Sequence, residues 1–367
     1  MSLDAAPARD YAAALSGTDY GEAFLEETAW TSAMLEDGRV QDVGSGSDRG
    51  MGLRLLRRRD GRVETFSGSG PDANPAAAAR LRAGLLAAGG ASAIKWTEPT
   101  TRRVIARVDP ASVTLETKVA LLQALDRTVR SEFPSVRQVT VAYGDRVKRT
   151  RVINTEGTDA RQDMVSTVIS ISVVVEEGRR LQTGYETVGA QRGWEIAENG
   201  APFAAARRAA ARALAKLRAP KAKAGEMPVV LSSSAGGTFI HEAIGHSLEM
   251  DHVQEGSSPA YRGAVGKTIA PENITVIDDP TLPFQRGSYF FDDEGVAAAP
   301  TALVSRGVLT GYLYDRTAAL REGRASNGHG RRELLRTARA PACRTCTSRP
   351  APTTRPPSSK AWSAACS

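Results

Sequence analysis

Three residues in the short stretch HEAIGH, His241, Glu242 and His246, have the types needed for metal-assisted hydrolysis. Neutral imidazoles are common zinc ligands, and a neighbouring glutamate can serve as the general base that activates water. Zinc peptidase helices usually read H-E-x-x-H, which places both histidines on one face of an α-helix. Here the two histidines stand five positions apart instead of four, so the spacing itself has to be explained.

The spacing predicts a distorted helix. Each residue of an α-helix turns by about 100°, so five steps leave the second side chain about 140° away from the first. One π-type widening would bring both imidazoles to the same side, and Gly245 gives the backbone freedom to bend there. We expect the distortion between 243 and 246, a Zn²⁺ ion on His241 and His246, and Glu242 as general base. The alternative is a helix start with ordinary surface or core histidines.

The remaining polar candidates carry weaker signals. His252 stands among acids in LEMDHVQE and is expected to be solvated. His329, in SNGHGRRE, is expected to be a loop histidine without a partner. The stretch SSSAGG at 232–237 lacks the Lys-Ser/Thr of a phosphate-binding loop, so it predicts a turn from a strand into a helix. No residues for an organic cofactor are predicted.

The elements that must position the motif follow from hydrophobic periodicity and turn residues. Helices are expected at 8–30, 74–89, 114–133 and 201–220. Strands and hairpins are expected at 34–56, 102–110, 136–157 and 164–189, and a buried strand at 227–234, directly before the motif. The pattern predicts an α+β fold: an N-terminal domain at 1–222 with a mostly antiparallel sheet and helices, and a β-rich domain at 227–333 that carries the metal-binding helix.

The last 34 residues, 334–367, differ from the rest in composition. They hold all three cysteines (Cys343, Cys346, Cys366), five arginines, one lysine and no acid. Removing this +6 from the net charge of +7 leaves +1 for the remainder, so the charge does not indicate a nucleic-acid partner. The segment has no Val, Ile, Phe, Met, Tyr or Gly, which is typical of disorder. It is expected to be a disordered, out-of-frame tail produced by a frameshift after Glu333.

Three longer stretches resemble the TldD branch of the TldD/PmbA metallopeptidases. They are VVLSSSAGGTFIHEAIGHSLEMD, ITVIDDPTLPFQRGSYFFDDEG and GVLTGYLYDRTAALREGRASNGHGRRE. The resemblance implies a two-domain zinc peptidase of the cytoplasm that takes unstructured peptides or small proteins in extended form. In that family His241 and His246 match the metal ligands and Glu242 the catalytic glutamate. The family's third ligand is a cysteine further along the C-terminal domain, past the point where the resemblance stops.

The family's usual partner is a paralogue without the metal motif, which forms a heterodimer with the peptidase. The leading hypothesis is therefore a zinc-dependent metallopeptidase, by lineage, with no nucleic acid and no membrane as partner. The alternative is a non-catalytic, truncated subunit that only binds a paralogous partner or a peptide. Neither a signal peptide nor a long apolar span is expected from the sequence.

Overall fold

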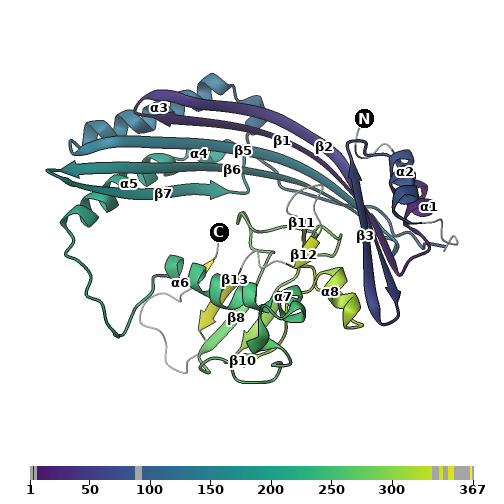
Figure 1. Cartoon of the computed structure of the whole chain (residues 1–367). Helices are drawn as coiled ribbons and strands as arrows, with labels where there is room; N and C mark the ends of the chain where they lie inside the picture. Colours follow the sequence, from purple (N-terminus) through teal and green to yellow (C-terminus); the bar gives the residue numbers. More distant parts are fainter. Residues whose placement is uncertain are drawn as a thin grey trace.

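A curved sheet of seven strands arches over a smaller domain that holds the HEAIGH motif (Figure 1). The computed structural model describes residues 3, 6–86, 93–332, 339–341, 346–350 and 364–365. The α+β class is confirmed, with helices and a mostly antiparallel sheet in the N-terminal part.

The large sheet has the strand order β3-β2-β1-β5-β6-β4, and β7 also pairs with β6. Every pair is antiparallel except β4 with β6. Its strands are β1 (Tyr20–Glu36), β2 (Arg39–Arg59), β3 (Arg62–Gly70), β4 (Thr100–Arg103), β5 (Val136–Asn154), β6 (Asp159–Glu177) and β7 (Arg180–Ala190). One turn of the hairpins expected at 34–56 is confirmed, since Asp37 and Gly38, which join β1 to β2, both adopt the positive φ of a tight hairpin turn. The further turns expected there are wrong, because the residues after Gly38 form the single long strand β2.

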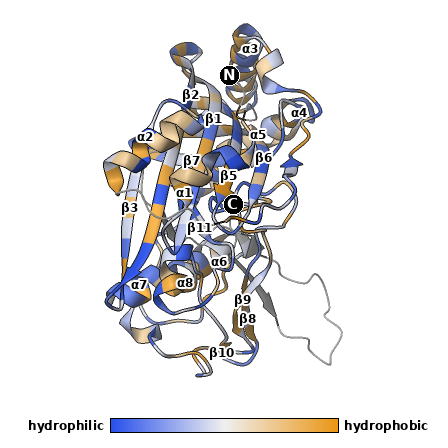
Figure 2. Cartoon of the chain, turned by 90° about the vertical axis from the view of Figure 1, so that its right-hand side faces the viewer, coloured by the Kyte–Doolittle hydropathy of each residue, from blue (hydrophilic) through white to orange (hydrophobic). Residues whose placement is uncertain are grey.

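The two faces of this sheet pack against different parts of the chain, because successive side chains of a strand point to opposite sides. Hydrophobic and hydrophilic residues accordingly alternate in short stretches along the strands (Figure 2). One face packs under helices in two separate cores, with α3 and α5 over one end and α1 and α2 over the other. The helices are α1 (Ala12–Leu15, after a 3₁₀ turn Ala8–Tyr11), α2 (Pro75–Leu85), α3 (Leu115–Glu132, after a 3₁₀ turn Pro110–Ser112), α4 (Glu195–Glu198) and α5 (Ala201–Arg218).

Three of the expected elements differ from the structure. The helix expected at 8–30 ends at Leu15, and β1 begins at Tyr20, because residues 20–36 pair with β2 and β5 on both sides. The strand expected at 102–110 is shorter and shifted, at Thr100–Arg103. The stretch at 227–232 is neither strand nor buried, and Val230 is 88% exposed. The three long helices expected at 74–89, 114–133 and 201–220 are confirmed.

The C-terminal domain is built around a second, smaller sheet with the strand order β10-β9-β8-β13-β14. Its strands are β8 (Ile274–Asp278), β9 (Thr301–Ser305), β10 (Val308–Leu309), β13 (Cys346–Pro350) and β14 (Ala364–Ala365), and β11 (Gly330–Arg332) pairs separately with β12 (Arg339–Pro341). Its helices are α6 (Ser233–Ile240), α7 (Met250–Glu255) and α8 (Arg316–Arg321), with a short 3₁₀ turn at Pro259–Tyr261. Short strands thus lie within the segment 334–367 that was expected to be unstructured. All of its other residues lie outside those described, so the out-of-frame tail stays a prediction.

A buried group of charges joins the large sheet to the C-terminal domain. Arg54 of β2 contacts carboxylates of both domains: Glu22 of β1 at 3.1 Å, Glu294 in a short ion pair, and Asp315 at 3.8 Å. We call these four residues the junction cluster; each side chain is at most 3% exposed. Nearby, the Gln162 amide of β6 donates to the Phe291 carbonyl at 2.8 Å. Glu22, Arg54 and Gln162 lie on the face of the sheet opposite the helices. This face is therefore bonded to the C-terminal domain.

Among the described residues, no helix is both long and apolar enough to cross a membrane.

Candidate metal centre

The HEAIGH motif follows directly on α6 and breaks its regular winding. Ser232 caps the helix, because its hydroxyl accepts a hydrogen bond from the Ala235 amide at 3.3 Å. From His241 to Gly245 the chain forms a π-helical turn, and the His246 amide donates to the His241 carbonyl, five residues back. A 3₁₀ turn, His246–Leu248, ends the segment. The predicted distortion is confirmed, and it overlaps the expected stretch 243–246 although it begins two residues earlier.

The wider turn brings the two imidazoles together. The ring centroids of His241 and His246 lie 4.3 Å apart with an interplanar angle of 66°. One potential ligand atom from each of His241, Glu242 and His246 lies within 4.8 Å of the others. Glu242 is exposed and both histidines are partly exposed, with the His246 side chain at 41%. An ion and a substrate could therefore reach these side chains from solvent.

The electrostatic surroundings favour the neutral form of His241. Burial, followed by the nearby His246, lowers the pKa of the His241 imidazole, while Glu242 and Glu249 oppose this shift. His241 Nδ1 is buried and has no hydrogen-bond partner among the described residues. A neutral imidazole with an unsatisfied nitrogen is the form that binds a divalent metal ion. The residues present thus fit a zinc ion in ligand type and spacing, and His241 also fits in its protonation.

Glu249 orients the second histidine. Its Oε1 lies 2.7 Å from His246 Nδ1, and its side chain is only 6% exposed. If the ring proton sits on Nδ1, it is donated to the carboxylate and Nε2 is left as an acceptor for a metal. The Leu313 carbonyl accepts from the Met250 amide and the Leu313 amide donates to the Leu248 carbonyl, both at 2.9 Å, so the backbone on each side of Glu249 is fixed.

Sequence reasoning missed this role of Glu249. The signal was an acid three positions after the second histidine, at a spacing where side chains of a helical turn can meet.

The two other histidines differ from the expectations. His252 is half-buried rather than freely solvated, and its Nδ1 lies 3.1 Å from the His246 carbonyl oxygen. His252 also forms a compact group with Glu249 and Asp251. Burial raises the pKa of the Asp251 carboxyl to about 6. His329 is 1% exposed and has partners, because its Nε2 lies 2.9 Å from Thr301 Oγ1 and its Nδ1 lies 3.4 Å from Asp278. Its burial was not predictable from a glycine-rich loop sequence.

No described side chain outside the motif joins the His241 group as a further ligand candidate. Cys343 and Cys366 lie outside the described residues, and of Cys346 only the backbone, at the start of β13, is described.

The chain is similar to known metallopeptidases along most of its length. The models of PmbA/TldA metallopeptidase domain 1, central domain and C-terminal domain match residues 21–85, 108–217 and 224–356 in order. A metalloprotease TldD homologue of Haemophilus influenzae is 32% identical over 330 residues, which cover 86% of this chain and 67% of that relative. The chain therefore belongs to the TldD/PmbA family of metallopeptidases.

Two further proteins extend the comparison. A zinc metalloprotease TldD homologue of Saccharolobus solfataricus is 28% identical over 224 residues, covering 60% of this chain and 49% of that protein. The crystal structure of TldE from Thermococcus kodakarensis superposes with a TM-score of 0.72 at 18% identity, covering 90% of this chain and 74% of that one. The TldE likeness shows a shared fold. The third family match also extends beyond Glu333, and truncation at that residue stays a prediction.

Proposed function

We propose that this chain is a zinc-dependent peptidase of the TldD type that cleaves unstructured peptides or small proteins in extended form. The observation that carries the proposal is the π-helical turn, which gathers His241, Glu242 and His246 although their spacing forbids it on a regular α-helix. Membership of a metallopeptidase family and the zinc named for one relative support the same assignment.

Each residue of the motif has a distinct role in this proposal. His241 and His246 hold the metal through neutral imidazoles, and Glu249 fixes the ring of His246 through their 2.7 Å contact. When bound, a zinc ion polarises the peptide carbonyl and lowers the pKa of water toward about 7. Glu242 is exposed beside both histidines, so its carboxylate accepts the proton of the attacking water and delivers it to the leaving amine.

The family relation also supports a proposal about the partner. The chain shares its fold with TldE, and a paralogous subunit without the metal motif is the partner that we propose. The cytoplasmic location remains a prediction. The alternative function, a subunit that only binds a partner or a peptide, would leave the three motif residues without a role.

The substitution Glu242→Gln tests the catalytic assignment. It preserves the size of the side chain and removes its basicity, so we expect peptidase activity to fall by at least about 10²-fold while zinc is still bound. Activity is measured on a fluorogenic unstructured peptide, and bound zinc by elemental analysis after dialysis. The nearby Glu255→Gln substitution, on an exposed residue at the end of α7, is the matched control. If zinc binds and Glu242→Gln cleaves as fast as the unmodified chain, the peptidase proposal fails.

A further inference from the structure

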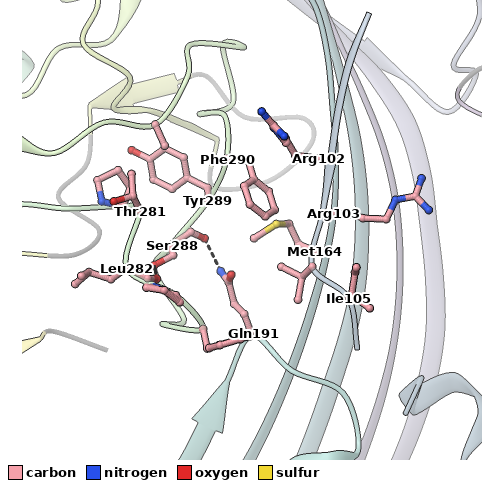
Figure 3. A pocket seen from close by; sticks show the side chains of 15 residues that line it. Arg102, Arg103, Ile105, Met164, Gln191, Thr281, Leu282, Ser288, Tyr289 and Phe290 are labelled. Atoms are coloured by element: carbon pink, nitrogen blue, oxygen red, sulfur yellow. Dashed lines mark hydrogen bonds between the residues drawn. The ribbon is translucent and has the colours of Figure 1, made fainter. Parts of the chain in front are cut away.

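A cavity that does not include the metal helix lies between the edge of the large sheet and a loop of the C-terminal domain (Figure 3). Its volume is about 670 Å³, within the usual range of ligand sites. One wall is the end of β4 and the residues after it, with Met164 of β6, and the other wall is the loop at 280–290. No residue of the HEAIGH motif lines it.

The lining is mainly apolar, and part of it is exposed. Ile105 is 82% exposed, Phe284 48% and Phe290 36%. Exposed apolar groups gathered around a cavity typically mark a binding surface rather than scattered surface residues. The two charged residues that line the cavity, Arg102 and Arg103, are both basic. Arg102 lies beside Phe290 at the cavity, whereas the Arg103 side chain points away from it (Figure 3).

The loop wall is held in place by hydrogen bonds, so the cavity is formed in advance. The Gln191 amide donates to the Phe284 carbonyl at 3.0 Å, and its side chain donates to the Ser288 carbonyl. Phe284 adopts a φ of +63°, which is unfavourable for a residue with a side chain, and the Arg192 guanidinium lies 3.9 Å from its ring centroid. Strained residues that are held this firmly tend to occur at binding sites.

The other wall offers backbone groups for pairing. All four residues of β4 are exposed, and among the described strands β4 pairs only with β6. The Val104 amide donates to the Asp163 carbonyl of β6 at 2.8 Å. Because neighbouring residues of an extended chain direct their N–H and C=O groups to opposite sides, those of Arg103 and Ile105 face the open edge. An extended peptide can add to such an edge as a further strand.

We propose that this cavity and the edge of β4 together bind an extended peptide that carries an apolar side chain and, two residues away, a carboxylate. The apolar side chain fills the cavity between Leu282 and Phe290. Side chains two residues apart share one face of a strand, so the carboxylate reaches Arg102. The peptide main chain pairs with Arg103 and Ile105. This site binds without zinc and does not depend on the peptidase proposal.

Fluorescence anisotropy with labelled peptides tests the proposal on the full chain in EDTA, so that no cleavage interferes. The probe is TETLTET; TETSTET removes the apolar side chain and TKTLTKT reverses the charge. We expect TETSTET to bind about tenfold more weakly, because a leucine side chain is no longer buried. N-methylation of the probe backbone at the edge-facing amides should also weaken binding.

Charge exchange gives the sharper test. Arg102→Glu should weaken the binding of TETLTET and strengthen that of TKTLTKT, because the charge beside the cavity is reversed. Since Arg102 is exposed, solvent screens the charge pair, and we expect a change of at least about threefold. Arg39→Glu is the matched control, because Arg39 is exposed at the start of β2 and does not line the cavity, so this change should leave the order of the peptides unchanged. Equal binding of TETLTET and TETSTET, or equal effects of the two arginine substitutions, would overturn the proposal. So would self-association that blocks the probe, which would make the face an interface between two copies of the chain.

Discussion

Two polar centres of this molecule contrast with each other, the HEAIGH turn and the junction cluster of Arg54, Glu22, Glu294 and Asp315. Both contain ionisable side chains, and in both of them burial shifts the pKa of at least one such group. The junction cluster is almost fully buried, and its charges contact one another across the two domains. The HEAIGH turn is partly exposed, and within the described part of the chain a buried ring nitrogen of His241 has no hydrogen-bond partner.

The contrast shows that a perturbed pKa is not by itself the mark of an active site. Burial raises the pKa of Glu294 to about 8, since Asp315, Asp292 and Glu22 add to the effect and Arg54 only opposes it. The carboxylates around Arg54 raise its pKa although burial alone would lower it. No substrate can reach these groups, so their role is to join the domains. The partly exposed histidines of the HEAIGH turn, which solvent can reach, are the better candidates for chemistry.

The largest effect is expected from removing the cation of the junction cluster. Arg54→Met removes the buried cation and the N–H donors that Glu22, Glu294 and Asp315 share, which should lower the free energy of unfolding by about 3–5 kcal/mol. Denaturant unfolding measures this change. His241→Ala serves as the comparison and should cost less than about 1 kcal/mol, because its side chain is partly exposed and has few partners. If the two substitutions destabilise the chain equally, the contrast between the centres is wrong.

A pH series should separate the same two centres. The folded pKa of Glu294 is about 8 and exceeds its unfolded value of 4.5, so the folded state keeps a proton that the unfolded state releases. The stability contributed by this group is therefore present below about pH 4.5 and lost as the pH rises toward 8. In Glu294→Gln that loss should disappear, measured as the difference between the two unfolding curves at each pH. Parallel curves over this range would contradict the assignment.

A smaller and more local effect is expected at Glu249. Glu249→Gln removes the carboxylate that orients His246 and should weaken zinc binding by about 10–100-fold. Competition with a chromophoric chelator measures the affinity independently of catalysis. Glu242→Gln is the control and should leave zinc affinity close to that of the unmodified chain. A general loss of folding, visible as a changed circular dichroism spectrum, would instead indicate a structural role for Glu249.

The smallest effect is expected at the start of the metal helix. Ser232→Ala removes the cap of α6, which should cost about 1 kcal/mol or less locally. Hydrogen exchange of the amides in α6 should become faster, whereas exchange around the junction cluster should not change. Faster exchange in both regions would show that the two centres are coupled rather than independent.

The sequence by itself determined features that depend on neighbouring residues. The spacing of His241 and His246, with a glycine between them, was sufficient to predict the π-helical turn. The three long helices and the Asp-Gly hairpin were predicted correctly for the same reason, because periodicity and turn chemistry are local properties. The resemblance to the TldD/PmbA family was also readable from the sequence, in the three stretches at 229–251, 274–295 and 307–333.

Only the tertiary structure decided the features that join distant parts of the chain. Residues 20–30 have a composition that suits a helix, yet pairing with β2 and β5 makes them a strand. His329 is buried because it meets Thr301 and Asp278, and the junction cluster joins residues separated by more than 200 positions. Such contacts arise when sheets and loops pack together, and a local pattern holds no information about which distant side chain will be the partner.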